Sequence, residues 1–233
     1  MFAAGKQLMT SAPPNNTKSL LHFNGSSGST TITDECGVTW TNSGSIPLST
    51  AESKFGGSSL NVPATANAFL YSNDPVFNKV GKVPFTAECW FKPSPIYYNT
   101  ILNTSISTAV RPVQPVLIIS YPQYTWGTIE VHIGNAALDG WVVAANYGSS
   151  VADGAWHHIA VVGDGTNITV YVDGASICSV AHPNWSFGVD IQGFGTSAFS
   201  SYGSPYIDEF RYSNIARYTG NFTPPTAEFS ATG

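Results

Sequence analysis

Apolar and polar residues alternate along much of the chain with the period of two that is typical of β-strands. The pattern is clearest in three neighbouring runs, at residues 156–162, 168–172 and 175–180. Asp173-Gly174 separates the second run from the third. An Asp-Gly pair between alternating runs favours a tight hairpin, because both turn residues accept positive φ. The sequence therefore predicts a three-stranded antiparallel meander here.

Runs with the same β-branched and aromatic bias recur along the rest of the chain, separated by Gly, Pro, Asn and Ser. They lie at 20–23, 38–41, 59–62, 68–71, 85–92, 100–103, 116–121, 128–133, 141–147, 187–192 and 206–212. Only a single turn at 214–218 fits a helical period. Many short strands without crossover helices predict antiparallel sheets packed as a sandwich, and no break in composition divides them into two domains.

The run at 85–92 indicates which residues face the core. Its odd positions are apolar, whereas Thr86, Glu88 and Lys92 occupy the other face. Such alternation predicts one face on the core and the other toward solvent or a groove. Cys89 then lies inward as a small hydrophobic residue, as does Cys178 in the meander. Cys36 falls in a loop and has no evident partner.

Charge and composition exclude several classes of function. Nine Lys and Arg against 14 Asp and Glu give a net charge of −5 without a basic cluster, which argues against nucleic-acid binding. The apolar runs are too short to cross a bilayer, so no membrane insertion is expected. Three cysteines do not form a disulfide framework. The chain begins without the apolar stretch of a secretory signal, so we expect no signal peptide.

The first 18 residues contain Pro13-Pro14 and show no apolar periodicity. They are predicted to form an extended N-terminal arm ahead of a single domain at 19–233. Alone such an arm is mobile. Either a partner chain or the surface of its own domain could hold it in place.

Several short motifs occur in a consistent order along the chain. They are LLHFNG at 20–25, SKFG at 53–56, FTAECW at 85–90, WHHIA at 156–160, YVDG at 171–174 and YIDEFR at 206–211. Together they resemble the laminin G-like domains of the concanavalin A-like lectin/glucanase superfamily, over about residues 20–225. The ending ARYTGNFTPP at 216–225 resembles bacteriophage virion proteins that carry this domain. The resemblance implies an all-β jelly roll of two antiparallel sheets.

Members of this superfamily bind glycans, proteins or lipids, and some cleave glycans, so the fold does not settle the function. A glycosidase needs two carboxylates facing each other across the scissile bond. The E-x-D-x-E run of the related glucanases is absent here, and Glu130 shares its strand face with Thr128 and His132. No G-x-S-x-G elbow is present either. We therefore predict a protein that is not an enzyme, although acids from separate strands could still converge.

His157 and His158 are neighbours on a predicted strand. Their side chains should point to opposite faces, so they cannot share a metal ion. We expect one to be half-buried and hydrogen-bonded and the other to lie at the surface.

The resemblance also implies one structural calcium between a loop after the first strand and the closing strand. Asp34 and Asp208 stand at those places. Calcium takes six to eight oxygen ligands, which two carboxylates, carbonyls and water could supply. Asn24 stands where many relatives carry Asp, which weakens the case. Otherwise Asp208 and Arg211 would be ordinary charges at the rim.

Two proline-rich connections, at 93–99 and 121–127, hold the best candidate contact surface. They contain the aromatic residues Tyr97, Tyr98, Tyr121, Tyr124 and Trp126. Proline lowers the entropy cost of holding a loop in one shape, and Tyr and Trp present apolar faces with polar tips. Such residues suit the C–H face of a sugar or the surface of a partner protein. Alternatively, they cap the core of the sandwich.

These observations predict a non-enzymatic structural protein of a bacteriophage virion, assembled in the host cytoplasm. It would act either as a capsid decoration (cement) protein or as a glycan-binding module of a tail fibre or tailspike. Its partners would be other virion proteins through the arm, copies of itself (a trimer by analogy), and a host-surface glycan. The alternative is a carbohydrate-binding module of a secreted polysaccharide-active enzyme.

Overall fold

The computed structural model describes most of the chain. The described residues are 15–63, 68–77, 82–94, 99–103, 117–121, 129–134, 141–147, 151, 153–182, 192–195 and 205–232. Strand β1 begins at Thr17, one residue before the predicted end of the arm at residue 18, and residues 1–14 of that arm lie outside the described residues.

Nearly all regular structure in the described residues is β-strand. The strands are β1 (Thr17–Leu21), β2 (Thr41–Ser43), β3 (Leu48–Ser49), β4 (Ser59–Asn61), β5 (Phe69–Ser72), β6 (Phe85–Lys92), β7 (Asn99–Asn103), β8 (Leu117–Tyr121), β9 (Ile129–Gly134), β10 (Trp141–Tyr147), β11 (His157–Gly163), β12 (Asn167–Val172), β13 (Ala175–Ala181), β14 (Gln192–Gly195) and β15 (Tyr206–Ser213). One 3-10 turn, η1 (Pro75–Phe77), follows β5.

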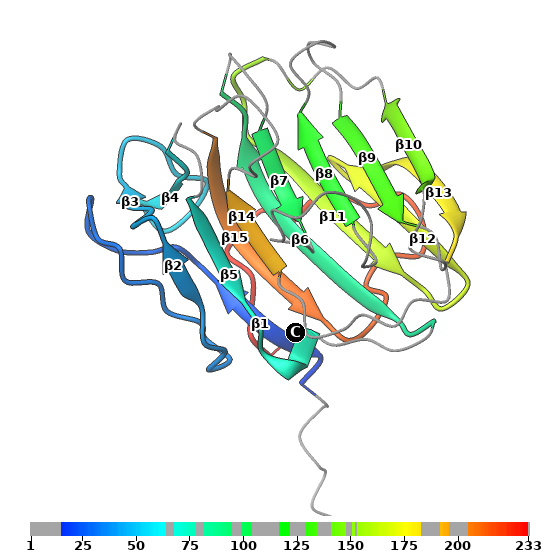
Figure 1. Cartoon of the computed structure of the whole chain (residues 1–233), viewed down its shortest axis with the longest axis horizontal. Helices are drawn as coiled ribbons and strands as arrows, with labels where there is room; N and C mark the ends of the chain where they lie inside the picture. The colour runs from blue at the N-terminus through cyan, green and yellow to red at the C-terminus, as the bar shows by residue number, and fades with distance from the viewer. Residues whose placement is uncertain are drawn as a thin grey trace, which may run out of the picture.

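The described strands form two antiparallel sheets that lie one behind the other (Figure 1). We call the 8-stranded sheet, in the order β13-β12-β11-β6-β15-β4-β3 with β1 added beside β15, sheet A. The 7-stranded sheet, in the order β10-β9-β8-β7-β14-β5-β2, is sheet B. This arrangement confirms the predicted two-sheet jelly-roll sandwich.

A single large apolar core fills the space between the sheets. Sheet A contributes alternate residues of its central strands, such as Ala87 and Phe91 of β6, and sheet B contributes Ile129 and Val131 of β9. Cys89 and Cys178 belong to the same core, as the alternation predicts. Burial of such a continuous core is the main favourable term in folding.

The predicted meander is confirmed by strands β11, β12 and β13, which pair in sequence order. Asp173 (φ 49°) and Gly174 (φ 78°) both take the left-handed conformation that the hairpin turn requires. Gly174 also lies against the chain at Phe222, whose amide donates to the Gly174 carbonyl at 3.0 Å. A side chain at position 174 would collide with the Phe222 backbone.

Most other predicted strands agree with the structure to within a residue or two, and β6 and β10 agree at both ends. Short elements were harder to predict. The two-residue strand β3 and the turn η1 were missed, β2 begins where the predicted run 38–41 ends, and β14 begins at the last residue of the run 187–192. The predicted helical turn at 214–218 is irregular chain instead.

The outer face of sheet A is covered by residues 214–232, which we call the C-terminal segment. Its aromatic side chains pack on two small clusters on that face. Phe229 packs with Leu20 and Trp90, and Tyr218 and Phe222 pack against a cluster around Tyr171. Tyr218 and Phe222 also stack on each other, with ring centroids 3.5 Å apart.

This covering corrects the predicted exposure of strand β6. Thr86 and Glu88 were expected to face solvent or a groove, yet they are 0% and 1% exposed. Thr86 donates its hydroxyl hydrogen to the Ile215 carbonyl at 2.8 Å and accepts the Arg217 amide at 3.0 Å. Alternation identified the non-core face correctly but could not show that a distant segment covers it.

Glu88 is the centre of a buried polar network under the C-terminal segment. Arg211 donates to its Oε1 from Nε at 2.8 Å, and the Tyr218 hydroxyl donates to Oε2 at 2.7 Å. His158 Nε2 lies 3.2 Å from Oε2. Burial alone would raise the pKa of Glu88, but the His158 contact and the Arg211 charge outweigh it, so the pKa lies below its usual value. The network thus keeps a carboxylate ionised inside the protein.

We predict that Glu88→Gln lowers the free energy of unfolding by about 3 kcal/mol, because Arg211 would keep a buried charge without its counter-charge. Chemical denaturation at neutral pH measures the change. Glu52→Gln is the matched control, since Glu52 pairs with Lys92 at 2.7 Å on the surface and should change stability by less than about 1 kcal/mol. Equal effects at the two positions would contradict a stabilising role for the network.

Candidate functional site

The two aromatic connections emerge at the same end of sheet B. One of them enters β7 at Asn99, and the other leaves β8 at Tyr121 and enters β9 at Ile129. Asn99 pairs with Tyr121 across the sheet. One residue further along, Ser120 pairs with Glu130, and Ile129 pairs with Tyr147 at the end of β10. These residues lie at the ends of four neighbouring strands. We call this end, marked by Asn99, Tyr121, Ile129 and Tyr147, the aromatic end of sheet B.

The predicted contact residues themselves are only partly described. Tyr97, Tyr98, Tyr124 and Trp126 lie outside the described residues, and Tyr121 is the last residue of β8. What the structure adds is that the chain segments leading into both connections are neighbours. Sequence reasoning missed Tyr147 as a further aromatic residue at this end, because only the strand register brings it there.

Asp34, one of the two predicted calcium ligands, organises the loop after β1. Its Oδ2 accepts hydrogen bonds from the Ser19 hydroxyl (2.5 Å), the Leu20 amide (3.2 Å) and the Trp40 indole (3.0 Å). Its Oδ1 accepts the Cys36 amide at 2.7 Å. A carboxylate has about four lone-pair sites, so a calcium ion bound here would have to displace some of these donors.

Asp208, the other predicted ligand, sits at an irregularity in β15. Here the partner of β15 changes from β4 to β1. Between the pairs Asp208–Trp90 and Arg211–Glu88, two residues of β15 lie opposite one residue of β6. Asp208 is fully buried and accepts the amides of Lys54 (2.7 Å), Phe55 (3.1 Å) and Glu209.

Burial raises the pKa of Asp208 to about 7, although the amides of Lys54 and Phe55 oppose the rise. The charge of the neighbouring Glu209 carboxylate contributes to this rise in the pKa. The alternative that Asp208 and Arg211 are rim charges is wrong, since they are 0% and 8% exposed.

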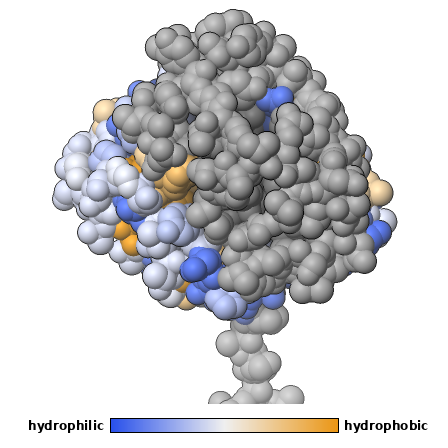
Figure 2. Space-filling model, viewed as in Figure 1, coloured by the Kyte–Doolittle hydropathy of each residue, from blue (hydrophilic) through white to orange (hydrophobic). Residues whose placement is uncertain are grey.

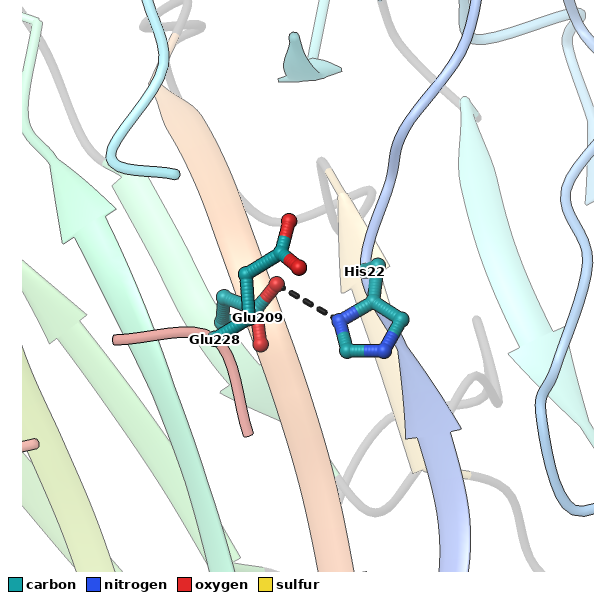
Figure 3. Close-up of side chains that lie close together, drawn as sticks. All are labelled: His22, Glu209 and Glu228. Atoms are coloured by element: carbon teal, nitrogen blue, oxygen red, sulfur yellow. Dashed lines mark hydrogen bonds and ion pairs between the residues drawn. The ribbon is translucent and has the colours of Figure 1, made fainter. Parts of the chain in front are cut away.

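Three side chains of types that can bind metals, which the sequence analysis did not bring together, lie close to one another beside this irregularity (Figure 3). His22 directly follows β1, Glu209 belongs to β15, and Glu228 belongs to the C-terminal segment. One ligand atom from each lies within 4.8 Å of the others. His22 and Glu209 each fall in a motif of the resemblance, but no spacing in the sequence brings them together with Glu228.

A small hollow adjoins this cluster. It is lined by His22, Asn24, Thr31, Thr33 and Glu35, with Leu48 at its apolar side. On the face in Figure 2, the described residues are mainly hydrophilic or near neutral, and hydrophobic colour appears only in small areas. No helix among the described residues has the length and apolar character needed to cross a membrane.

His157 and His158 differ from the expected pair. Both are buried, at 7% and 0% exposure, so the prediction that one lies at the surface is wrong. They do lie on opposite faces: the His157 ring lies against Phe91 of the core, and His158 lies against Trp90 of the outer cluster. His157 bridges the carboxylates of Asp173 (2.7 Å) and Asp153 (2.9 Å). Although burial opposes it, these hydrogen bonds raise the pKa of His157.

The sequence matches one known family over residues 64–219. That family is described as the concanavalin A-like lectin/glucanases superfamily. The match confirms the superfamily suggested by the motifs. No curated protein matches the sequence.

Several solved structures with a similar fold are binding domains of bacterial toxins. The binding domain of Paraclostridial Mosquitocidal Protein 1 is 13% identical, with a TM-score of 0.67 over 87% of this chain and 50% of that one. The botulinum neurotoxin serotype D ligand binding domain, solved with N-acetylneuraminic acid, is 11% identical, with a TM-score of 0.63 over 88% and 48%.

The binding domain of botulinum neurotoxin DC, solved with rat synaptotagmin II, is 11% identical, with a TM-score of 0.64 over 87% and 49%. The chain therefore spans about half the length of these toxin domains. At such low identities the likeness is one of fold alone.

We propose that Asp34 and Asp208 bind calcium, and Asp208 is the better candidate ligand of the two. A cation beside this buried carboxylate would stabilise its ionised form. We then expect excess EGTA to lower the melting temperature relative to calcium-supplemented protein, and the difference to vanish in Asp208→Asn. Melting followed by circular dichroism measures both. If EGTA leaves the melting temperature of the parent chain unchanged, the calcium proposal is wrong.

Proposed function

Because the chain belongs to the concanavalin A-like lectin/glucanases superfamily, we propose that it is a non-enzymatic recognition domain that binds a glycan at the aromatic end of sheet B. The observation that carries the proposal is the strand register. Asn99, Tyr121 and Ile129 are neighbours, so both aromatic connections adjoin the same end of sheet B.

The two faces of the sandwich differ in a way that favours this location. The C-terminal segment covers much of the outer face of sheet A with Tyr218, Phe222 and Phe229, leaving Trp90 5% and Tyr171 4% exposed. A ligand on that face would have to compete with this packing. Sheet B has no comparable covering by the C-terminal segment among the described contacts, so its end is the better candidate.

Chemistry of the connections supports a sugar as the ligand. Tyr97, Tyr98, Tyr124 and Trp126 are amphipathic, and their rings can stack on the C–H face of a pyranose while the polar tips donate hydrogen bonds. A toxin domain of similar fold was solved with N-acetylneuraminic acid, which makes sialylated glycans a sensible first probe.

The buried acids of the described residues favour recognition over hydrolysis. Glu88 is bound by Arg211 and Tyr218, and Asp208 accepts three backbone amides. Catalytic carboxylates of a glycosidase instead face a substrate across an open site. The hydrogen bonds of Glu88 and Asp208 are made within the domain and stabilise its fold.

We further propose that the domain works as part of a bacteriophage virion, either on a tail appendage that touches host glycans or as capsid cement. This rests on the resemblance of the ending at 216–225 to virion proteins. A carbohydrate-binding module of a secreted enzyme is the alternative.

Tyr98→Ala and Trp126→Ala are each expected to weaken glycan binding at least about tenfold, because each removes a stacking surface of an amphipathic ring. Binding is measured first on an array of sialylated and neutral oligosaccharides, then by titration calorimetry with the best ligand. Both variants should keep the parent melting temperature.

Tyr71→Ala is the matched control. It removes an aromatic ring from strand β5 of sheet B, away from the aromatic end. Tyr71 pairs with Gly193, and Gly193 pairs with Asn103 at the opposite end of β7 from Asn99. Loss of binding in Tyr71→Ala alone would move the site away from the aromatic end. Unfolding of the Tyr98 and Trp126 variants would show that these rings belong to the core.

The virion proposal predicts that the full chain self-associates, with a trimer as the expected mass by light scattering. Symmetric virion appendages are built from repeated copies, and closed symmetry is the rule for such oligomers. A monomer at high concentration would favour the alternative of a carbohydrate-binding module.

A further inference from the structure

We propose that His22, Glu209 and Glu228 form a binding site for a divalent transition-metal ion such as Zn²⁺. The site does not depend on the proposed glycan binding, since it lies at β15, in sheet A. Its ligands come from the residue after β1, from β15 and from the C-terminal segment, so a bound ion would join three distant parts of the chain (Figure 3).

The donor atoms already lie close together. His22 Nδ1 and Glu209 Oε1 are 2.7 Å apart. One ligand atom from each of His22, Glu209 and Glu228 lies within 4.8 Å of the other two. Around tetrahedral zinc, ligand atoms at 2.0–2.2 Å from the metal lie about 3.4 Å from each other. The pair would therefore open by less than about 1 Å to admit an ion, and any proton on Nδ1 would pass to solvent.

Each carboxylate is also held by a second protein donor, as in metal sites whose ligands are oriented by an outer shell. The Phe229 amide donates to Glu209 Oε2 at 2.7 Å. The Asn24 side-chain amide donates to Glu228 Oε1 at 2.9 Å. An aspartate at position 24 could not donate this hydrogen bond and would repel Glu228.

Burial and charge are graded across the cluster. Glu209 is fully buried, the His22 side chain is 19% exposed, and Glu228 is exposed. Two carboxylates face one imidazole, which leaves negative charge that a divalent cation would balance. The exposed side at Glu228 gives an ion a path from solvent and leaves room for water as a fourth ligand.

The mixture of ligand atoms selects the type of metal. One imidazole nitrogen with two carboxylate oxygens suits Zn²⁺ and other first-row transition ions, whereas Ca²⁺ and Mg²⁺ prefer oxygen alone. This distinguishes the site from the calcium expected at Asp34 and Asp208. The bound ion would fasten the C-terminal segment to β15 and β1.

Titration calorimetry of the full chain with ZnCl₂ tests the proposal. We expect about one Zn²⁺ per chain, unaffected by millimolar Ca²⁺ or Mg²⁺, and a rise in melting temperature with zinc concentration. Cobalt(II) should give absorption bands of a low-coordinate N/O site and should be displaced by zinc. His22→Gln and Glu228→Gln should each weaken zinc binding at least about tenfold.

Glu35→Gln is the matched control, because it removes an exposed carboxylate beside the same hollow without touching the cluster. It should bind zinc like the parent chain. His22 and Glu228 are not part of the main core, so their variants should fold without metal, which circular dichroism checks. Absence of binding by the parent, or binding that survives in both His22→Gln and Glu228→Gln, would overturn the proposal.

Discussion

Burial of both faces of sheet A is the constraint on which the rest of the structure depends. Strands β6 and β11 carry an apolar face toward the core, and their other face lies under the C-terminal segment. That second face includes the Glu88 carboxylate, whose burial without partners would be costly. Arg211 and Tyr218 supply partners for Glu88, and Tyr218 comes from the covering segment itself. The C-terminal segment therefore both buries Glu88 and supplies one of the hydrogen bonds that this burial needs.

The irregularity at Asp208 and Glu209 follows from how sheet A is assembled. Strand β15 must pair first with β4 and then with β1, and the extra residue occurs at the change of partner. Such bulges locally disrupt the ladder and re-aim side chains. Asp208 accepts the free amides of Lys54 and Phe55 near β4, and Glu209 (φ 53°) turns toward His22 after β1. The change of pairing partner thus places the carboxylates of Asp208 and Glu209 beside their partners.

The sequence was sufficient for the longer strands, their antiparallel arrangement and the core face, because these depend on local alternation and on turn residues such as Asp173 and Gly174. It was not sufficient for the outer face of sheet A. Nothing in strand β6 shows that Glu88 is buried, since the residues that cover it lie more than a hundred positions later. The same holds for His22, Glu209 and Glu228, which only the folded chain brings together. Local periodicity reports which face a residue occupies, but not what lies on that face.

The covering segment also changes what its own sequence means for function. Residues 216–225 resemble the ending of virion proteins and could be taken for an attachment element. In the structure, Tyr218 and Phe222 are used within the domain, where they pack on the cluster around Tyr171. The virion proposal therefore rests on the resemblance of this ending alone, and not on Tyr218 or Phe222 being free to attach a partner. The proposed recognition at the aromatic end of sheet B is separate from this packing, because among the described contacts the C-terminal segment packs on sheet A.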